Sequence, residues 1–293
     1  MRIFIAGNRG QLGCDCSAVL GTAHEVFGSD LPELDIADMA SVVAACADGV
    51  PDVIVNCAAF TKVDACETEI DAARSANSEG PAVLARYARE SGIFLVHVST
   101  DYVFDGARPV PQPYTEEDAT HPVSAYGRTK LDGEVAVQRT HADHAILRTA
   151  WLYGASGHNF LKTILRVALA RPDRPLRVVS DQYGSPTWSL SLARQIARVV
   201  ECHATGLFHA TAEGCCTWYE FASAFLESMG VSHEIQPCTS AEYPTPARRP
   251  ANSILENGQL KKQGIHVMRP WQDDMAEFVA RHREALLADC APG

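Results

Sequence analysis

Residues 2–13 read Arg2-Ile3-Phe4-Ile5-Ala6-Gly7-Asn8-Arg9-Gly10-Gln11-Leu12-Gly13, a short apolar run followed by three glycines spaced three residues apart. An apolar run of this length predicts a buried strand. The missing side chains at Gly7, Gly10 and Gly13 allow the backbone to approach a pyrophosphate at the N-terminus of the next helix. The pattern alone also fits a simple tight turn, but its place directly after a strand favours a dinucleotide site that includes Gln11 and Leu12.

Apolar runs alternate with longer amphipathic stretches through the first half of the chain. The expected strands cover residues 2–6, 24–29, 53–57, 94–99 and 145–148, and the expected helices cover 11–20, 39–47, 72–91 and 125–140. Buried strands separated by helices form right-handed crossovers in a parallel sheet that is covered on both faces. The sequence therefore predicts an α/β fold with a Rossmann-like, doubly wound parallel sheet.

The pattern becomes irregular after Trp151, where prolines separate shorter elements. Residues 190–202 and 206–210 nevertheless have the pattern of one further helix and strand of the sheet. We expect a dinucleotide-binding domain and a smaller, discontinuous C-terminal lobe of the loop-rich kind that often binds substrate. The expected domain covers 1–150, with 188–212 returning to it, and the expected lobe covers 151–187 and 213–293.

Composition and charge exclude several classes of protein. The 293 residues are 46% hydrophobic and 21% charged, as in ordinary globular proteins. The net charge of −11 argues against a nucleic-acid partner, because binding to phosphates relies on clustered Lys and Arg. The early glycine turn leaves no room for a signal peptide, and no apolar run is long enough for a membrane span. We therefore expect a cytoplasmic protein with no membrane partner, mostly free cysteines and no structural metal.

Acidic and small residues follow the second and third expected strands. Asp30 stands where a carboxylate can accept hydrogen bonds from the adenosine ribose, which favours NADH, although it could equally be a solvated loop residue. Arg9 can meet a 2′-phosphate, which favours NADPH, so the sequence leaves the choice of cofactor open. The other residues expected to cover the adenine or lie along the cofactor are Asp35, Ile36, Ala58, Ala59 and Phe60.

Tyr126 and Lys130 stand four residues apart in one expected helix, so their side chains share a face. An ammonium group there can lower the pKa of the tyrosine and make it a usable proton donor. Thr100 closes an expected strand at the carboxyl edge of the sheet, where a hydroxyl can polarise a substrate carbonyl. These three residues in this order predict an active site. Asn77 is either an ordinary polar residue of a helix or a backbone-bonded support for the lysine.

The chain resembles the dTDP-4-dehydrorhamnose reductase family of extended short-chain dehydrogenases over nearly its whole length. The glycine turn and the Tyr-x-x-x-Lys pair belong to the whole superfamily, whereas other blocks are much narrower. The narrowest are Ser99-Thr100-Asp101-Tyr102-Val103-Phe104 and Asp181-Gln182-Tyr183-Gly184-Ser185-Pro186-Thr187. Further matching blocks lie at 56–64, 148–154 and 249–253.

The resemblance implies NADPH- or NADH-dependent reduction of the C4 ketone of dTDP-4-dehydro-6-deoxy-L-mannose (dTDP-4-keto-L-rhamnose) to dTDP-L-rhamnose. It implies that Tyr126 protonates the new alkoxide, with Lys130 and Thr100 tuning that tyrosine. It also implies that Thr100, Asp101 and Trp151 contact the dTDP-sugar. Related reductases act on other deoxysugar nucleotides, so the exact keto sugar and its pathway stay open.

Two residues depart from the family pattern. Cys57 stands where the family often has alanine, a change that a small apolar thiol tolerates. Some members of the family form homodimers through magnesium held by acidic residues. Here Asp15 is the one candidate ligand, because Leu190 fills another such position. A homodimer is compatible with the sequence, but a magnesium ion is not supported by it.

Two other functions compete with the reductase. A nucleotide-sugar dehydratase or epimerase would share the fold and Tyr126, but dehydratases typically carry an acidic pair after the threonine, and Asp101-Tyr102 breaks that pair. The regulatory subunit of methionine adenosyltransferase resembles this family without being a catalyst. A binding subunit of that kind would have no need of an intact Thr100, Tyr126 and Lys130. Stoichiometric consumption of added NAD(P)H separates a reductase from both alternatives.

Overall fold

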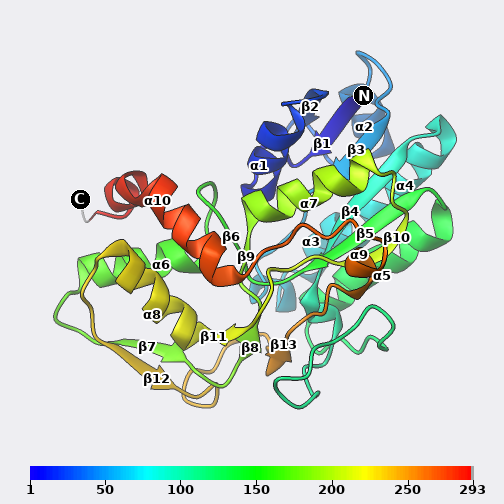
Figure 1. Ribbon diagram of the computed structural model, residues 1–293. Coiled ribbons are helices and arrows are strands. Elements are labelled where there is room, and N and C mark those ends of the chain that lie inside the picture. Colours follow the sequence, from blue (N-terminus) through cyan, green and yellow to red (C-terminus); the bar gives the residue numbers. More distant parts are fainter. Residues whose placement is uncertain (292–293) are drawn as a thin grey trace.

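The computed structural model describes residues 1–291, and its central feature is a six-stranded parallel sheet (Figure 1). The strand order is β10-β5-β4-β3-β1-β2. The strands are β1 (Arg2–Ala6), β2 (Glu25–Ser29), β3 (Val53–Asn56), β4 (Phe94–Thr100), β5 (His144–Thr149) and β10 (Gly206–His209). Because β2 lies on one side of β1 and all later strands lie on the other, the sheet has a topological switch between β1 and β3. Ligands of open α/β sheets bind outside the carboxyl ends of the strands at such a switch.

Helices cover both faces of the sheet, which confirms the predicted doubly wound fold (Figure 1). Side chains alternate along each strand, so Ile3 and Ile5 pack on one face while Phe4 packs on the other. The helices of the first face are α1 (Gln11–Leu20) and α7 (Ser189–Glu201), and those of the second face are α2 (Met39–Ala45), α4 (Gly80–Ser91) and α5 (Ala125–Thr140).

The single helix expected over 72–91 is wrong, because the chain forms α3 (Ile70–Arg74), a π-helical turn (Ser75–Glu79) and α4. Pro81 has no N–H group and cannot bond to the carbonyl of Asn77, so the regular helical ladder is interrupted there. The α5 helix approaches the same carbonyl so closely that a Cβ on Gly133 would lie 2.2 Å from it. Turns of this kind occur often at functional sites.

The remaining elements form a smaller unit around a separate aromatic core that includes Tyr153, Trp188 and Phe278 (Figure 1). Its helices are α6 (Phe160–Ala170), α8 (Trp218–Met229) and α10 (Trp271–Cys290). Its strands pair as β6 (Leu152–Tyr153) with β9 (Thr187–Trp188), β7 (Leu176–Val179) with β12 (Ile235–Cys238), and β8 (Tyr183–Gly184) with β11 (Cys216–Thr217) and β13 (Asn252–Ser253). Three short helices complete the chain: η1 (Ala65–Glu67), η3 (Asp101–Val103) and α9 (Gly258–Lys262).

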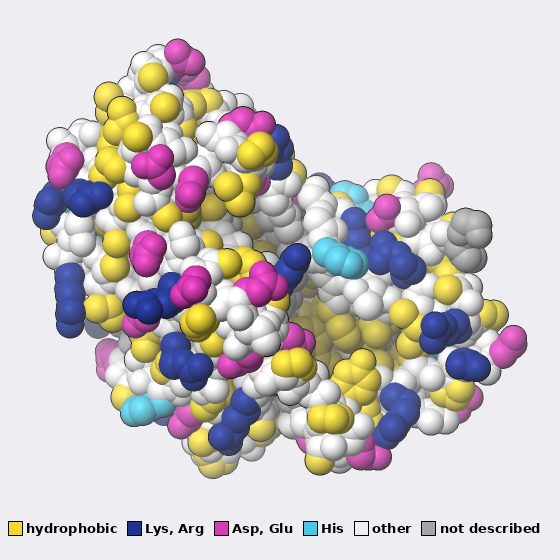
Figure 2. Space-filling view, turned by 180° about the vertical axis from the view of Figure 1, so that it is seen from behind, with side chains coloured by type: hydrophobic (Ala, Val, Ile, Leu, Met, Phe, Trp, Pro, Cys, Tyr) yellow, Lys and Arg dark blue, Asp and Glu magenta, His cyan; other side chains and the backbone are white. Residues whose placement is uncertain are grey.

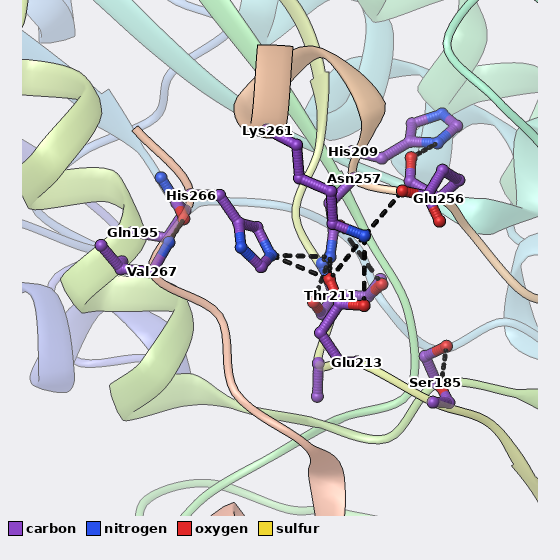
Figure 3. A network of polar contacts seen from close by, with 12 residues as sticks. Ser185, Gln195, His209, Thr211, Glu213, Glu256, Asn257, Lys261, His266 and Val267 are labelled. Atoms are coloured by element: carbon purple, nitrogen blue, oxygen red, sulfur yellow. Dashed lines mark hydrogen bonds and ion pairs between the residues drawn. The ribbon is translucent and has the colours of Figure 1, made fainter. Parts of the chain in front are cut away.

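A polar network fastens the smaller unit to the β10 edge of the sheet (Figure 3). The amide of Asn257 donates to the carbonyl of Thr211 and to the carboxylate of Glu213, each at 2.9 Å, and accepts from the N–H of Thr211 at 3.0 Å. Glu213 pairs in turn with His266 at 2.9 Å and with Lys261 at 3.1 Å. This network fixes the path of the chain after β10. None of the helices within residues 1–291 has both the length and the apolar character needed to cross a membrane.

Candidate active site

A cleft of about 500 Å³ opens beyond the carboxyl ends of the strands, and Figure 2 shows hydrophobic side chains gathered in a hollow between the two parts of the molecule. The first part of the chain lines it with Gly10, Gln11, Leu12, Cys57, Ser99, Thr100, Asp101, Tyr102, Tyr126 and Lys130. The smaller unit lines it with Trp151, Tyr153, His158, Phe160, Trp218 and Phe221. The cleft therefore has one polar wall and one aromatic wall.

The glycine turn between β1 and α1 has the geometry that its spacing predicts. Gly7 has a φ of 79°, and a Cβ there would lie 2.9 Å from the backbone of Ala58. Gly10 is the N-cap of α1, and no side chain caps that end of the helix, which leaves its N–H groups open to an anion. Gly13 lines neither this cleft nor the second cavity described below. The absence of a side chain there lets α1 pack on the turn, because a Cβ on Gly13 would lie 2.0 Å from the carbonyl of Gly7.

A second cavity of about 530 Å³ shares Gly10, Cys57 and Ala59 with the cleft. It brings together the residues that the sequence predicts around the adenine and its ribose. They are Asp30, Asp35, Ile36, Ala58, Ala59 and Phe60, with Gly7 beside them. The two cavities together form a continuous groove along the switch point of the sheet.

Arg9 and Asp30, the two residues that leave the choice of cofactor open, are bonded to each other's backbone. The Asp30 carboxylate accepts from the N–H of Arg9 at 3.3 Å and from that of Leu31 at 2.8 Å. The Arg9 guanidinium donates to the carbonyls of Asp30 and Leu31 and pairs with the carboxylate of Glu33. Nothing in the sequence indicated this contact with Glu33, because no spacing rule relates that residue to a glycine turn.

Thr100, Tyr126 and Lys130 all line the cleft. Thr100 ends β4, and its hydroxyl donates to Oδ1 of Asp101 at 2.9 Å. The Lys130 ammonium donates to the carbonyl of Val98 at 2.7 Å. The structure thus gathers the predicted trio in one place.

The approach of α5 to this edge depends on Gly127, which directly follows Tyr126. A Cβ on Gly127 would lie 2.2 Å from the carbonyl of Tyr102, so any larger residue would push α5 away. Ser124 begins the helix by accepting the N–H of Gly127 at 3.1 Å. The local sequence therefore determines both the start of α5 and its close approach to η3, the turn that follows β4.

Burial dominates the protonation behaviour of the catalytic candidates. It raises the pKa of Tyr126 above its ordinary value, and the Thr100 hydroxyl offsets this only in part. Burial also lowers the pKa of Lys130 to about 8, against the raising effect of the Glu134 carboxylate. Burial is the largest influence on the Tyr126 pKa and its direction is upward, and the lowering of that pKa by Lys130 stays a prediction. A phenol with a raised pKa stays protonated at neutral pH, as a proton donor must.

The Asn77 side chain joins two elements of the site. Its side chain accepts the N–H of Phe60 at 2.9 Å and donates to the carbonyl of Phe60 at 3.1 Å. It also donates to the hydroxyl of Thr129 at 3.2 Å. Asn77 thus ties the loop after β3 to α5 at Thr129, the residue before Lys130, and its role toward the lysine stays a prediction.

Asp101 and Trp151 both line the cleft, and both lie beside Ser253. Asp101 is buried, and burial raises its pKa to about 6 against the lowering effect of hydrogen bonds with Ser253 and Thr100. The Trp151 indole stacks on Trp218, with ring centroids 3.5 Å apart and an interplanar angle of 8°. Sequence reasoning missed Trp218, since no pattern links it to a residue 67 positions earlier.

A buried ion pair between Glu134 and Arg148 lies near Lys130, and nothing in the sequence indicated it. Arg148 on β5 donates to both carboxylate oxygens of Glu134, at 2.9 and 2.7 Å, and Ser99 donates to the same group at 2.5 Å. Glu134 follows Lys130 by four residues on α5, so it faces the same side of the helix. The pair therefore anchors the lysine's helix to β4 and β5.

Asp15, the remaining candidate magnesium ligand, lies near Arg194 and His282. Burial raises the pKa of its carboxylate, which accepts a hydrogen bond from Ser189, and the charges of His282 and Arg194 oppose the rise. Across residues 1–291, no cluster of three His, Cys, Asp or Glu side chains is placed to hold a metal ion. The residues around Asp15 do not fit a magnesium site.

Comparison with known proteins identifies the family. Residues 1–284 match the family model described as the RmlD substrate binding domain. A dTDP-4-dehydrorhamnose reductase of Sinorhizobium fredii is 39% identical over 95% of this chain and 97% of its own. A dTDP-4-keto-6-deoxy-D-glucose reductase of Streptomyces niveus is 39% identical over 92% and 93%. The structure of dTDP-4-dehydrorhamnose reductase from Bacillus anthracis in complex with NADP is 33% identical, covers 96% of this chain and 99% of its own, and has a TM-score of 0.91. The chain belongs to the RmlD family, as its sequence motifs indicated.

Proposed function

We propose that the protein is an NAD(P)H-dependent reductase that converts dTDP-4-keto-L-rhamnose to dTDP-L-rhamnose. The convergence of Thr100, Tyr126 and Lys130 on a cleft continuous with the glycine turn carries the proposal. The names of two relatives support the class of substrate, because one is a reductase of dTDP-4-dehydrorhamnose and the other a reductase of dTDP-4-keto-6-deoxy-D-glucose.

The groove fits a dinucleotide along its length. The uncapped N-terminus of α1 and the close backbone at Gly7 and Gly10 would hold the pyrophosphate. Asp35, Ile36 and the segment 58–60 would enclose the adenine end, and the nicotinamide end would lie in the cleft beside Lys130. When bound, the reduced dinucleotide supplies the hydride that the C4 carbon of the sugar accepts.

The proton comes from the protein. As the C4 oxygen gains negative charge, the Tyr126 phenol transfers its proton to that oxygen, leaving a phenolate that solvent reprotonates. When substrate binds, the Thr100 hydroxyl would turn its single proton from Asp101 to the same oxygen and keep the carbonyl beside the tyrosine. The Lys130 ammonium stabilises the transient phenolate, which burial otherwise disfavours.

Asp101 and Trp151 would hold the sugar. The Asp101 carboxylate lines the cleft and can accept a hydrogen bond from a sugar hydroxyl. The face of the Trp151 indole offers an apolar surface to the deoxy side of the ring. A dehydratase would need a second acidic residue directly after Asp101 to eliminate water. Tyr102 occupies that position, so a reductase is favoured over a dehydratase.

The decisive experiment mixes the purified protein with dTDP-4-keto-L-rhamnose generated in situ and follows the oxidation of NADPH and NADH separately. Stoichiometric oxidation with formation of dTDP-L-rhamnose, abolished in Tyr126→Phe, is expected. No oxidation of either cofactor contradicts the proposal. Oxidation only with dTDP-4-keto-6-deoxy-D-glucose moves the assignment to that sugar. Turnover without net cofactor consumption favours the epimerase alternative, and no turnover at all favours a binding subunit.

A further inference from the structure

Trp151 has an unusual backbone. Its φ of 48° lies in the left-handed region, which bulky side chains rarely adopt, and within residues 1–291 His203 is the only other residue besides glycine with a positive φ. Such conformations persist where the surroundings determine them, and they are common at binding sites.

Three elements of the smaller unit enclose the Trp151 indole. Trp218, the first residue of α8, stacks on it almost in parallel at 3.5 Å. The indole N–H donates to the hydroxyl of Ser253 on β13 at 3.2 Å. Gly184 on β8 leaves the remaining room, because a Cβ there would lie 2.4 Å from the indole ring.

Trp218 is itself held firmly. The capping box of Thr217 and Glu220 fixes the start of α8, with the hydroxyl of Thr217 accepting the N–H of Glu220 at 3.1 Å. The Phe160 ring packs against Trp218 with centroids 4.6 Å apart. The capped start of α8 therefore holds the Trp218 ring, and the residue with the strained backbone, Trp151, carries the other ring of the stack.

We propose that Trp218 is a positioning residue of the active site, which holds the Trp151 indole in place as the wall that faces the sugar. The inference rests on the proposed function, because it takes the cleft to be the sugar site. Loss of the stack removes the contact that offsets the backbone strain, so Trp151 relaxes and the aromatic wall recedes. Sugar binding should then weaken, while the second cavity, which neither tryptophan lines, is unaffected.

The test compares Trp218→Leu with Trp218→Phe, which keeps an aromatic face, and with Trp188→Phe, which alters a buried tryptophan that does not line the cleft. An aromatic pair of this kind corresponds to about a three- to tenfold change in an equilibrium. Trp218→Leu should raise the KM for the keto sugar by about that factor, with the KM for NADPH unchanged. Trp218→Phe should recover most of the loss, and Trp188→Phe should leave both KM values alone.

A second readout needs no turnover. Stacked indoles contribute to the near-ultraviolet circular dichroism, and the same band should disappear in Trp151→Phe and in Trp218→Leu but persist in Trp188→Phe. Retention of the band or of the wild-type sugar KM in Trp218→Leu overturns the inference, as does an equal rise of the KM for sugar and for NADPH. If the wild-type protein reduces no keto sugar, the proposed function fails. The positioning role is then decided by the circular dichroism band and by dTDP-L-rhamnose binding to the same variants.

Discussion

The side chain of Gln11, at the start of α1, accepts a hydrogen bond from the amide of Asn159 at 2.9 Å across 148 residues of sequence. Asn159 also donates to the carbonyl of Gly154 at 2.8 Å and caps α6 by accepting the N–H of Lys162 at 3.1 Å. The loop between Gly154 and Asn159 therefore rests on the glycine turn. This contact links the cofactor groove to the aromatic wall of the cleft.

Removal of this link should affect both ligands. Gln11→Ala removes the acceptor for Asn159, and a hydrogen bond of this kind contributes about 1 kcal/mol, or roughly fivefold in binding. We expect the KM values for the keto sugar and for NADPH to rise together by about that factor in steady-state kinetics. Gln236→Ala, an exposed position in the smaller unit, serves as the control. A rise confined to one ligand would show that the contact does not couple the two sites.

Loss of the phenol should remove most of the activity. Tyr126→Phe deletes the proton donor, for which general acid catalysis predicts a fall in kcat of about 10² to 10⁴-fold. The neighbouring Tyr102, whose ring lies 5.4 Å from that of Tyr126, provides a matched control. Tyr102→Phe should retain kcat within about tenfold. Single-turnover rates with NADPH measure both variants, and equal losses would contradict the assignment of the donor.

The pH dependence of kcat/KM should be bell-shaped. Burial raises the pKa of Asp101 to about 6, so its carboxylate forms as the pH rises through that value. Burial lowers the pKa of Lys130 to about 8, so its ammonium is lost as the pH rises further. Because the reaction needs the carboxylate and the ammonium, the limbs should fall near these two values in the free enzyme.

Two variants assign the limbs. Asp101→Asn cannot titrate and should flatten the acid limb, while Lys130→Arg keeps its charge and should move the alkaline limb upward. Initial rates across a pH series provide the measurement. If both limbs stay in place in these variants, other groups control the profile.

The choice of cofactor should respond to Glu33. In the structure this exposed carboxylate pairs with Arg9 beside the second cavity. Glu33→Gln frees the guanidinium for a 2′-phosphate, and an exposed charge pair of this kind changes binding by about two- to fivefold. The ratio of kcat/KM for NADPH to that for NADH should rise by that factor, whereas Arg9→Ala should lower it. An unchanged ratio in both variants would exclude Arg9 from cofactor recognition.

The buried pair of Glu134 and Arg148 should matter greatly for stability. Glu134→Leu leaves an unpaired guanidinium in the core, and breaking a buried pair in this way costs about 3 to 5 kcal/mol. Urea unfolding monitored by circular dichroism should show this loss. The exposed pair of Arg198 and Glu201 is the control, because Glu201→Gln should change the free energy of unfolding by less than about 1 kcal/mol. Similar effects of the two substitutions would contradict the structural importance of the buried pair.

The sequence by itself determined the parts of the fold that depend on neighbouring residues. The apolar run and glycine spacing at the start of the chain predict β1, the turn and α1 with their observed bounds. The start of α5 follows from Ser124 and the residues after it, and four-residue spacing puts Tyr126 and Lys130 on one face. The parallel sheet then brings Thr100 to the same edge, because the carboxyl ends of neighbouring strands meet there.

Only the tertiary structure decided the features that join distant segments. The stack of Trp218 on Trp151 and the pairing of Arg148 with Glu134 depend on how separate elements pack, for which no local pattern exists. The break at Pro81 depends on the approach of α5 as well as on the proline. The pKa of Tyr126 shows the same limit. The four-residue spacing puts Lys130 on the same helical face, but it does not reveal the burial that raises the pKa of the phenol. Desolvation and close packing are properties of the assembled core, and so they determine the chemistry of a site whose residues the sequence had already named.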